Sequence, residues 1–338
     1  MSLLNTPVAK TNEVFETVRA ISRETPLLTS AALDDLAGLK LFVKAESLQH
    51  TGSFKLRGAF YRLKNLAPAE RRNGVVAYSS GNFAQGLARA GKILGVPVTI
   101  VMPHDVPLTK VAGTRQYGAQ VVFTKPDGRP REVVAAETAA NLAESGQLAL
   151  LHPFDDEDLV LGHSSLGTEI LQQLKTFEDA RPLDTLLVPA GGGGLAAGIA
   201  VALRAHGSTT RLIAVEPVGY DDLARSLAAG ERQRNANASS TLCDGLQAVS
   251  PGAVPFSVLQ QSLSGAIHVS DQEVTFAMRA AVEHIKLVLE PSGASALAAA
   301  LAAKTRGLEL GKRVGVVCSG GNISADYFAK LVAEAPRH

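Results

Sequence analysis

The sequence predicts an α/β protein with parallel β-sheets, and three observations support this class. Short apolar, β-branched runs alternate along the chain with segments of helical pattern, as in parallel strands joined by crossover helices. Several of these runs end in glycine-containing loops, which is where open α/β sheets bind ligands. The length of 338 residues predicts two structural lobes rather than one compact unit.

The individual elements follow from this alternation. Apolar runs predict strands at residues 41–43, 75–77, 98–101, 120–123, 185–188, 212–215 and 314–317. Helical patterns predict helices at residues 82–91, 111–117, 164–174 and 195–205. The alanine-rich stretch at residues 294–303 predicts a buried helix.

Composition limits the partners and the location of the protein. The 33 basic and 32 acidic residues leave a formal net charge of +1, and without a long basic run this balance does not indicate a nucleic-acid partner. Cys243 and Cys318 are the only cysteines, so we expect free thiols and a cytoplasmic location. No apolar run reaches the roughly 18 residues of a membrane span, so no membrane partner is expected.

A run of four glycines follows one predicted strand and precedes a predicted helix: Gly191, Gly192, Gly193 and Gly194. Without side chains, their backbone N–H groups can approach a phosphate at a helix N-terminus, where the dipole favours negative charge. Residues 192–197 also fit the G-x-G-x-x-A pattern of dinucleotide-binding proteins, and Glu216 ends the next strand. An NAD-dependent oxidoreductase is therefore an alternative function. It gives no role to two other features of the sequence, a lysine between apolar residues (Lys55) and a glycine-containing loop at residues 319–322.

Lys55 lies between two apolar residues, Phe54 and Leu56. Apolar surroundings lower the pKa of a buried lysine, and the neutral amine is the form that attacks a carbonyl group. A single lysine in this setting is more often an amphipathic surface residue. Three glycine-containing loops after predicted strands, at residues 79–82, 191–194 and 318–322, favour a functional role instead.

Further motifs follow in order along nearly the whole chain: Thr51-Gly52-Ser53-Phe54-Lys55, Thr114-Arg115-Gln116-Tyr117-Gly118-Ala119, His152-Pro153-Phe154-Asp155-Asp156, Asp244-Gly245-Leu246 and Glu290-Pro291-Ser292-Gly293-Ala294. Together with the glycine loops, they resemble the fold type II pyridoxal phosphate enzymes of the serine/threonine dehydratase and serine racemase family. The resemblance implies a tryptophan synthase β-like fold with two open parallel-sheet lobes and the cofactor between them. It also implies a large cofactor-binding domain of residues 1–74 and 151–338, a small domain of residues 75–150, and no C-terminal regulatory domain.

The resemblance assigns roles around pyridoxal 5'-phosphate. Lys55 would form the Schiff base, Phe54 would pack near the ring, and Asn82 would bond the ring hydroxyl. The four glycines and Leu195 would hold the phosphate. Ser319 would meet the pyridine nitrogen. A neutral hydroxyl cannot keep that nitrogen protonated, so the ring becomes a weaker electron sink, which suits rapid β-elimination.

The loop that follows the second predicted strand is assigned to the amino acid substrate, because hydroxyl and backbone donors at a helix start suit an α-carboxylate. The expected substrate-binding residues are Ser79, Ser80, Gly81, Asn82, Phe83 and, by a looser alignment with a carboxylate-binding arginine, Arg131. Ser80 corresponds to the acid/base of racemase relatives, on the cofactor face opposite the lysine. Relatives usually have histidine where Phe83 stands, which indicates a more apolar pocket. His163 departs from the Gly-Gln-Gly-Thr pattern of relatives, and we interpret it as a helix-end histidine with satisfied hydrogen bonds.

Two carboxylates, Glu216 and Asp222, flank a turn, and the carbonyl of Tyr220 lies between them in sequence. Such oxygen-only ligands suit Mg²⁺, Ca²⁺ or Mn²⁺. The three residues fall where metal-activated relatives hold a divalent cation. The resemblance therefore implies a structural or activating Mg²⁺ or Mn²⁺.

The expected function is that of a pyridoxal phosphate-dependent dehydratase (ammonia-lyase), a carbon–oxygen lyase acting on a small-molecule amino acid. It would convert threonine, serine, 3-hydroxyaspartate or phenylserine to a 2-oxo acid and ammonia by α,β-elimination. Lys55 would remove the Cα proton. The alternatives are an amino acid racemase of the same family, the NAD-dependent oxidoreductase named above, and a non-catalytic cofactor-binding sensor. Relatives of this kind are commonly homodimers, so we expect a homodimer.

Overall fold

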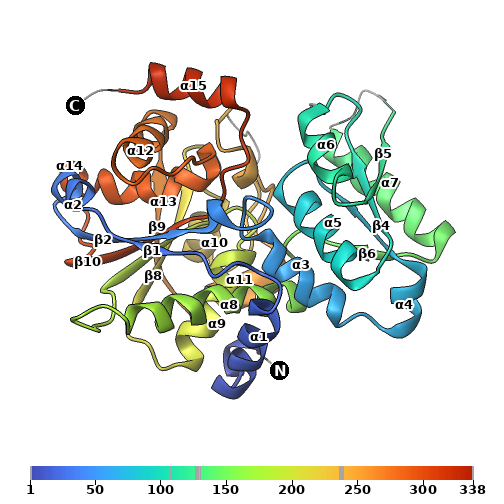
Figure 1. The fold of residues 1–338 in the computed structure, drawn as a ribbon, viewed down its shortest axis with the longest axis horizontal. Coiled ribbons are helices and arrows are strands. Elements are labelled where there is room, and N and C mark those ends of the chain that lie inside the picture. The colour runs from blue at the N-terminus through green and yellow to red at the C-terminus, as the bar shows by residue number, and fades with distance from the viewer. Residues whose placement is uncertain (1, 107, 126–128, 130, 236–239, 337–338) are drawn as a thin grey trace.

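The computed structural model describes residues 2–106, 108–125, 129, 131–235 and 240–336, without the side chains of residues 109, 131 and 132. Within this part of the chain, two α/β lobes lie side by side (Figure 1). Each lobe is built around its own β-sheet, a larger one of six strands and a smaller one of four. The predicted class, α/β with two open parallel-sheet lobes, is confirmed.

Seven strands coincide with the predicted apolar runs: β2 (Lys40–Ala45), β3 (Val75–Tyr78), β4 (Val98–Met102), β5 (Gln120–Phe123), β7 (Thr185–Pro189), β8 (Arg211–Pro217) and β10 (Arg313–Cys318). Three further strands were not predicted: β1 (Leu27–Leu28), β6 (Ala149–Leu151) and β9 (Leu263–Val269). The first two are too short to carry a pattern. In β9, Gly265 interrupts the apolar run, and the register against β8 shifts near the start of the strand.

The strand order explains why the glycine loops can meet. The large sheet has the order β1-β2-β10-β7-β8-β9, and the small sheet has the order β5-β4-β3-β6. All neighbouring strands are parallel except β1, which pairs antiparallel with β2. The carboxyl ends of parallel strands lie at one edge of a sheet, so the loops after β7 and β10 emerge close together.

The helices are α1 (Val8–Arg19), α2 (Ala31–Ala37), α3 (Lys55–Lys64), α4 (Pro68–Asn73), α5 (Asn82–Leu94), α6 (Leu108–Arg115), α7 (Arg131–Gly146), α8 (Glu157–Leu174), α9 (Gly194–Ala205), α10 (Asp222–Ala229), α11 (Ala253–Leu259), α12 (Asp271–His284), α13 (Pro291–Leu301), α14 (Ala303–Arg306) and α15 (Ala325–Glu334). Short 3-10 turns occupy η1 (Leu3–Asn5), η2 (Glu46–Leu48) and η3 (Asp244–Leu246). In the described part of the chain, no helix is both long enough and apolar enough to cross a membrane.

Helices cover both faces of the large sheet (Figure 1). Helices α2, α12 and α13 contribute to the core on one face, and α8 and α9 contribute to the core on the other. Every residue of α13 is buried, as predicted for the alanine-rich stretch. Small alanine side chains allow this helix to approach the sheet and α12 closely.

Helix α3 lies between the two lobes (Figure 1). Its residues Leu56 and Leu63 belong to the core of the small lobe, together with Leu87 of α5. On its other side, α3 contacts α8 of the large lobe. The first turn of α3 is therefore held by both lobes.

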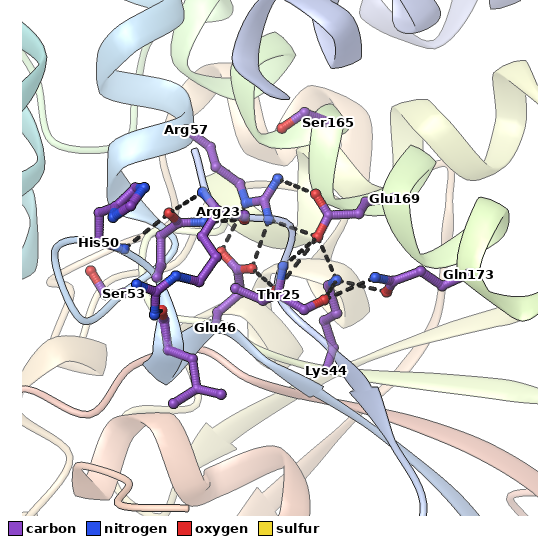
Figure 2. Close-up of polar contacts among 12 residues, drawn as sticks. Arg23, Thr25, Lys44, Glu46, His50, Ser53, Arg57, Ser165, Glu169 and Gln173 are labelled. Atoms are coloured by element: carbon purple, nitrogen blue, oxygen red, sulfur yellow. Dashed lines mark hydrogen bonds and ion pairs between the residues drawn. The ribbon is translucent and has the colours of Figure 1, made fainter. Parts of the chain in front are cut away.

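A buried charge cluster fixes α3 to the large lobe (Figure 2). Arg57 of α3 donates hydrogen bonds to both carboxylate oxygens of Glu46 and to both of Glu169 on α8, at 2.8 to 3.0 Å. Lys44 of β2 donates to Glu169 and to the carbonyl of Thr25. The two basic and two acidic side chains are buried, so each charge is neutralised inside the cluster.

Candidate active site between the lobes

Lys55 is the first residue of α3, at the junction of the lobes. Its Nζ donates a hydrogen bond to the Pro153 carbonyl oxygen at 2.8 Å. The ring centroids of Phe54 and Phe83 lie 5.2 and 5.6 Å from Nζ. Desolvation in these surroundings lowers the pKa of Lys55 to about 8. A substantial share of the amine is therefore neutral, and nucleophilic, at mildly alkaline pH.

The backbone of Lys55 supports the small lobe directly. A Cβ atom on Gly86 of α5 would lie 2.9 Å from the Lys55 carbonyl carbon and from the Leu56 nitrogen. Any side chain at position 86 would thus push α5 away from α3. The sequence shows a glycine inside a predicted helix, but nothing in the sequence indicates what it contacts.

Gly191, Gly192 and Gly193 lie in the turn between β7 and α9, and Gly194 is the first residue of α9. Gly193, the N-cap, is in the left-handed conformation (φ +87°). A Cβ atom on Gly192 would lie 2.2 Å from the ring of Phe154, so the bare backbone and this ring share the available space. The loop ends at the N-terminus of the 12-residue helix α9, where unpaired N–H groups favour an anion. Leu195 follows as a buried residue of the first turn. These features fit a bound phosphate.

The loop after β10 lies next to the segment that carries Lys55. The Ser319 carbonyl accepts a hydrogen bond from the Phe54 nitrogen at 3.1 Å, and Ser53 forms an isolated bridge with Gly320. Ser319 itself is buried. The structure therefore brings together Lys55 and Ser319, which are 264 residues apart in sequence.

The loop between β3 and α5 supplies the predicted substrate-binding residues. Gly81 is the N-cap of α5, and the hydroxyl of Ser79 accepts a hydrogen bond from the Gly81 nitrogen at 3.3 Å. Ser80 is half-buried. Phe83 is buried in the core of the small lobe, and its ring also approaches the Lys55 amine. Phe83 therefore contributes an apolar surface next to that amine, and a more apolar substrate pocket stays a prediction.

Asn82, the first residue of α5, connects the two lobes. Its Nδ2 donates to Glu290 Oε1 at 2.6 Å, and its Oδ1 accepts from Asn322 Nδ2 at 2.7 Å. Glu290 precedes α13, and Asn322 lies in the loop after β10. Sequence reasoning assigned no role to Glu290 or Asn322, although both belong to motifs that carried the resemblance.

Next to Pro153 lies an aromatic group to which sequence reasoning assigned no role: Tyr78, His152 and Phe154. Tyr78 Oη and His152 Nε2 lie 3.3 Å apart, and the His152 and Phe154 ring centroids are 4.5 Å apart. His152 Nδ1 accepts a hydrogen bond from the Asp155 nitrogen, so in the neutral imidazole the proton is on Nε2. Burial lowers the pKa of His152. These rings extend the apolar wall near Lys55.

The interpretation of His163 was wrong. The helix begins at Glu157, earlier than predicted, because Asp156 caps it. His163 therefore lies inside α8, fully buried, and neither ring nitrogen has a hydrogen-bond partner among the described residues. Desolvation lowers its pKa to about 3, so the imidazole is neutral and packs edge-on against Phe54.

The two carboxylates of the predicted cation site are both buried. Glu216, in β8, accepts hydrogen bonds from the backbone nitrogens of Leu223 and Ala224. Asp222 Oδ1 accepts from Asn235, whereas its Oδ2 is buried without a hydrogen-bond partner among the described residues. Within those residues, no group of three or more His, Cys, Asp and Glu side chains gathers as a metal site. The predicted set combines these two carboxylates with the carbonyl of Tyr220, an oxygen ligand of a different type.

Helix α7 begins at Arg131, the predicted ligand of a second carboxylate. The side chain of Arg131 lies outside the described residues. Its predicted role stays a prediction.

Comparison with known proteins agrees with this geometry. The family model described as "Pyridoxal-phosphate dependent enzyme" matches residues 18–320. The L-threo-3-hydroxyaspartate ammonia-lyase of Pseudomonas sp is 38% identical, over 94% of this chain and 95% of that protein. The serine racemase of Dictyostelium discoideum is 34% identical, over 95% and 96%. The crystal structure of the T.th. threonine deaminase has a TM-score of 0.86 at 39% identity, over 94% and 99%. This chain therefore belongs to the family of pyridoxal-phosphate dependent enzymes.

Proposed function

We propose that this protein is a pyridoxal phosphate-dependent ammonia-lyase, a carbon–oxygen lyase acting on a β-hydroxy-α-amino acid. The substrates considered are threonine, serine, 3-hydroxyaspartate and phenylserine, and the products are a 2-oxo acid and ammonia. The observation that carries the proposal is the Lys55 amine, held between two aromatic rings against the Pro153 carbonyl, with its pKa lowered to about 8. The names of the similar ammonia-lyase and threonine deaminase support the same reaction class.

Each residue of the site has a proposed role in binding the cofactor or in moving a proton. The glycine loop and Leu195 at the start of α9 bind the cofactor phosphate, and Phe54 packs near its ring. Ser319, at the end of β10, serves the pyridine nitrogen, and Asn82 serves the ring hydroxyl. When bound, the cofactor withdraws electrons from Cα and so acidifies the Cα proton. The Lys55 amine removes that proton and holds it on Nζ.

The start of α5 orients the substrate. Backbone N–H groups at this helix N-terminus, with the hydroxyls of Ser79 and Ser80, bind the α-carboxylate. Phe83 and the neighbouring rings exclude water from the Lys55 amine. The β-hydroxyl group then leaves as water, and the proton that Lys55 took from Cα balances the one that the departing hydroxyl gains.

Racemisation is the second candidate function. It needs a group that returns a proton on the face opposite Lys55, and Ser80 is the residue proposed for it. The serine racemase of Dictyostelium discoideum, similar over nearly the whole chain, supports this candidate. The NAD-dependent alternative loses support because the Glu216 carboxylate caps α10 rather than remaining free for a ribose.

We also propose a divalent cation, Mg²⁺ or Mn²⁺, bound by Glu216, Asp222 and the carbonyl of Tyr220. The unpaired, buried Asp222 Oδ2 supports this site, and burial together with the charge of Glu216 raises the pKa of Asp222 to about 7. A cation would neutralise both carboxylates. The homodimer, the cytoplasmic location, the two-domain division and the role of Arg131 stay predictions. Two buried, free cysteines support a reducing compartment.

The decisive experiment is borohydride reduction of the purified protein loaded with pyridoxal phosphate, followed by peptide mapping. After reduction, the cofactor should be covalently attached to Lys55. The Lys55→Ala variant should carry no covalently attached cofactor. Lys64→Ala, at the exposed end of the same helix, is the matched control and should be labelled like the wild type. Label on another lysine, or no label, would refute the site.

The reaction is then assayed as kcat/KM for 2-oxo acid release from the four substrates. Chiral chromatography of the remaining amino acid measures racemisation, which Ser80→Ala should reduce. Cofactor binding without turnover of any substrate would favour the sensor alternative. A strong preference for serine would contradict the apolar pocket.

A further inference from the structure

A chain of hydrogen-bonded side chains joins four segments between the lobes. Asn322 Nδ2 donates to the Thr51 carbonyl oxygen at 2.8 Å and to Asn82 Oδ1 at 2.7 Å. Asn82 Nδ2 donates in turn to Glu290 Oε1 at 2.6 Å. The loop before Lys55, the loop after β10, the start of α5 and the start of α13 are thereby connected.

The direction of every hydrogen bond in this chain follows from Thr51. A backbone carbonyl only accepts, so Asn322 must turn its NH₂ group toward it. The second hydrogen of that group then requires the oxygen of Asn82 as its acceptor. This turns the NH₂ group of Asn82 toward Glu290. The orientation of both amides is consequently determined by their partners.

With these orientations, one N–H of the Asn82 side chain has no acceptor among the described residues. Asn82 Nδ2 carries two hydrogens, and Glu290 Oε1 accepts one of them. For the other, the described part of the chain provides no hydrogen-bond partner. This second N–H of Asn82 is free to donate a hydrogen bond to a ligand bound between the lobes, and its direction is fixed by the other contacts of the amide.

We propose that Glu290 and Asn322 are positioning residues, which lock the Asn82 amide so that one N–H remains for the ring hydroxyl of the bound cofactor. This inference rests on the proposed function. It adds a pair of residues that need not touch the cofactor themselves. Their effect on cofactor binding should pass through Asn82.

The backbone next to Glu290 leaves room for its hydrogen bond with Asn82. A Cβ atom on Gly320 would lie 2.2 Å from Glu290 Oε1, so only glycine leaves room for the carboxyl group. Burial and the nearby charge of Asp244 raise the pKa of Glu290 to about 8, against the opposing effects of the hydrogen bond from Asn82 and of the charge of Lys110. A protonated carboxyl still accepts through its carbonyl oxygen. Glutamine, which has the same shape and the same acceptor, is therefore the conservative replacement.

The test is a double-mutant cycle on cofactor affinity, measured by titrating apo-protein with pyridoxal phosphate and following its visible absorption. Glu290→Ala should weaken binding about tenfold, the equivalent of one lost hydrogen bond. Glu290→Gln should restore affinity to within about twofold of the wild type. In an Asn82→Ala background, Glu290→Ala should have little further effect, because the group it positions is gone. Asn322→Ala should behave like Glu290→Ala, and it serves as the second cycle if Glu290→Ala does not fold.

Glu273→Ala is the matched control. Glu273 accepts a hydrogen bond from the Ser270 nitrogen at the start of α12, so removing this acceptor should lower thermal stability but leave cofactor affinity unchanged. An equal loss of affinity from Glu290→Ala with and without Asn82 would overturn the positioning role. A wild type that binds no pyridoxal phosphate would instead overturn the proposed function itself, so the two failures are distinct.

Discussion

Arg57 and Glu46 form a two-point ion pair inside the protein, with Nε and Nη2 each 2.8 Å from a carboxylate oxygen. Arg57 also binds Glu169, so one guanidinium joins η2, α3 and α8. Arg57 lies two residues beyond Lys55 in the same helix. The position of the first turn of α3, which carries Lys55, is therefore held by buried ion pairs.

Glu46→Gln should strongly destabilise the protein. The variant leaves one excess positive charge in the buried cluster, and loss of one partner of a buried ion pair typically costs about 3–5 kcal/mol. The measurement is the free energy of unfolding in urea. Lys10→Gln, which breaks the exposed pair of Lys10 with Glu13, is the control and should cost less than about 1 kcal/mol. Similar losses in both variants would show that burial of the cluster is unimportant.

Capture of pyridoxal phosphate by the apo-protein should accelerate as pH rises through about 8. The pKa of Lys55 is lowered to about 8 by desolvation, and only the neutral amine attacks the aldehyde. The rate should therefore be low below this value and should level off above it. Stopped-flow absorbance across the pH range measures it, with N-acetyl-lysine as the reference. A midpoint as alkaline as that of the free amine would contradict the apolar environment.

Gly192→Ala should reduce cofactor affinity by at least about tenfold. The added methyl group would meet the ring of Phe154 at 2.2 Å, so either the loop or the ring must move. If this contact is the cause, Phe154→Ala in the same chain should recover part of the loss. Titration with pyridoxal phosphate measures both variants. Failure of the second substitution to restore any binding would place the cause in the loop conformation itself.

Mg²⁺ or Mn²⁺ should raise the melting temperature of the wild type, and a chelator should reverse the change. The reason is that a cation would neutralise the buried Glu216 and Asp222 carboxylates. Asp222→Asn should remove the response. Asp221→Asn is the control, because Asp221 is half-exposed and pairs with Arg225. If neither the cation nor the chelator changes the melting temperature of the wild type, the proposed cation site is excluded.

Much of the fold could be predicted because its strands are buried on both faces and appear as continuous apolar runs. The run at Val314–Val317, for example, lies at the centre of the large sheet as β10. Strand β9 escaped prediction because Gly265 and polar residues interrupt it. Tertiary contacts rather than its own pattern hold it beside β8.

The site was predictable where chemistry is encoded locally. Lys55 and the glycine loop are marked by their immediate neighbours in sequence, so the sequence alone could indicate them. The contacts of Glu290 with Asn82, and of Arg57 with Glu169, join residues that are 208 and 112 positions apart. No local pattern marks such pairs. His163 was misread for the same reason, since its surroundings come from α3 and α9.

The close approach of Gly86 to Lys55 has a mechanical meaning. Helix α5 begins at the loop proposed to bind the substrate carboxylate. One turn later its Gly86 packs on the backbone of Lys55 with no side chain in between. A tilt of α5 on carboxylate binding would be transmitted to Lys55 without a compressible layer to absorb it. The close contact at Gly86 thus couples the position of α5 mechanically to the position of Lys55.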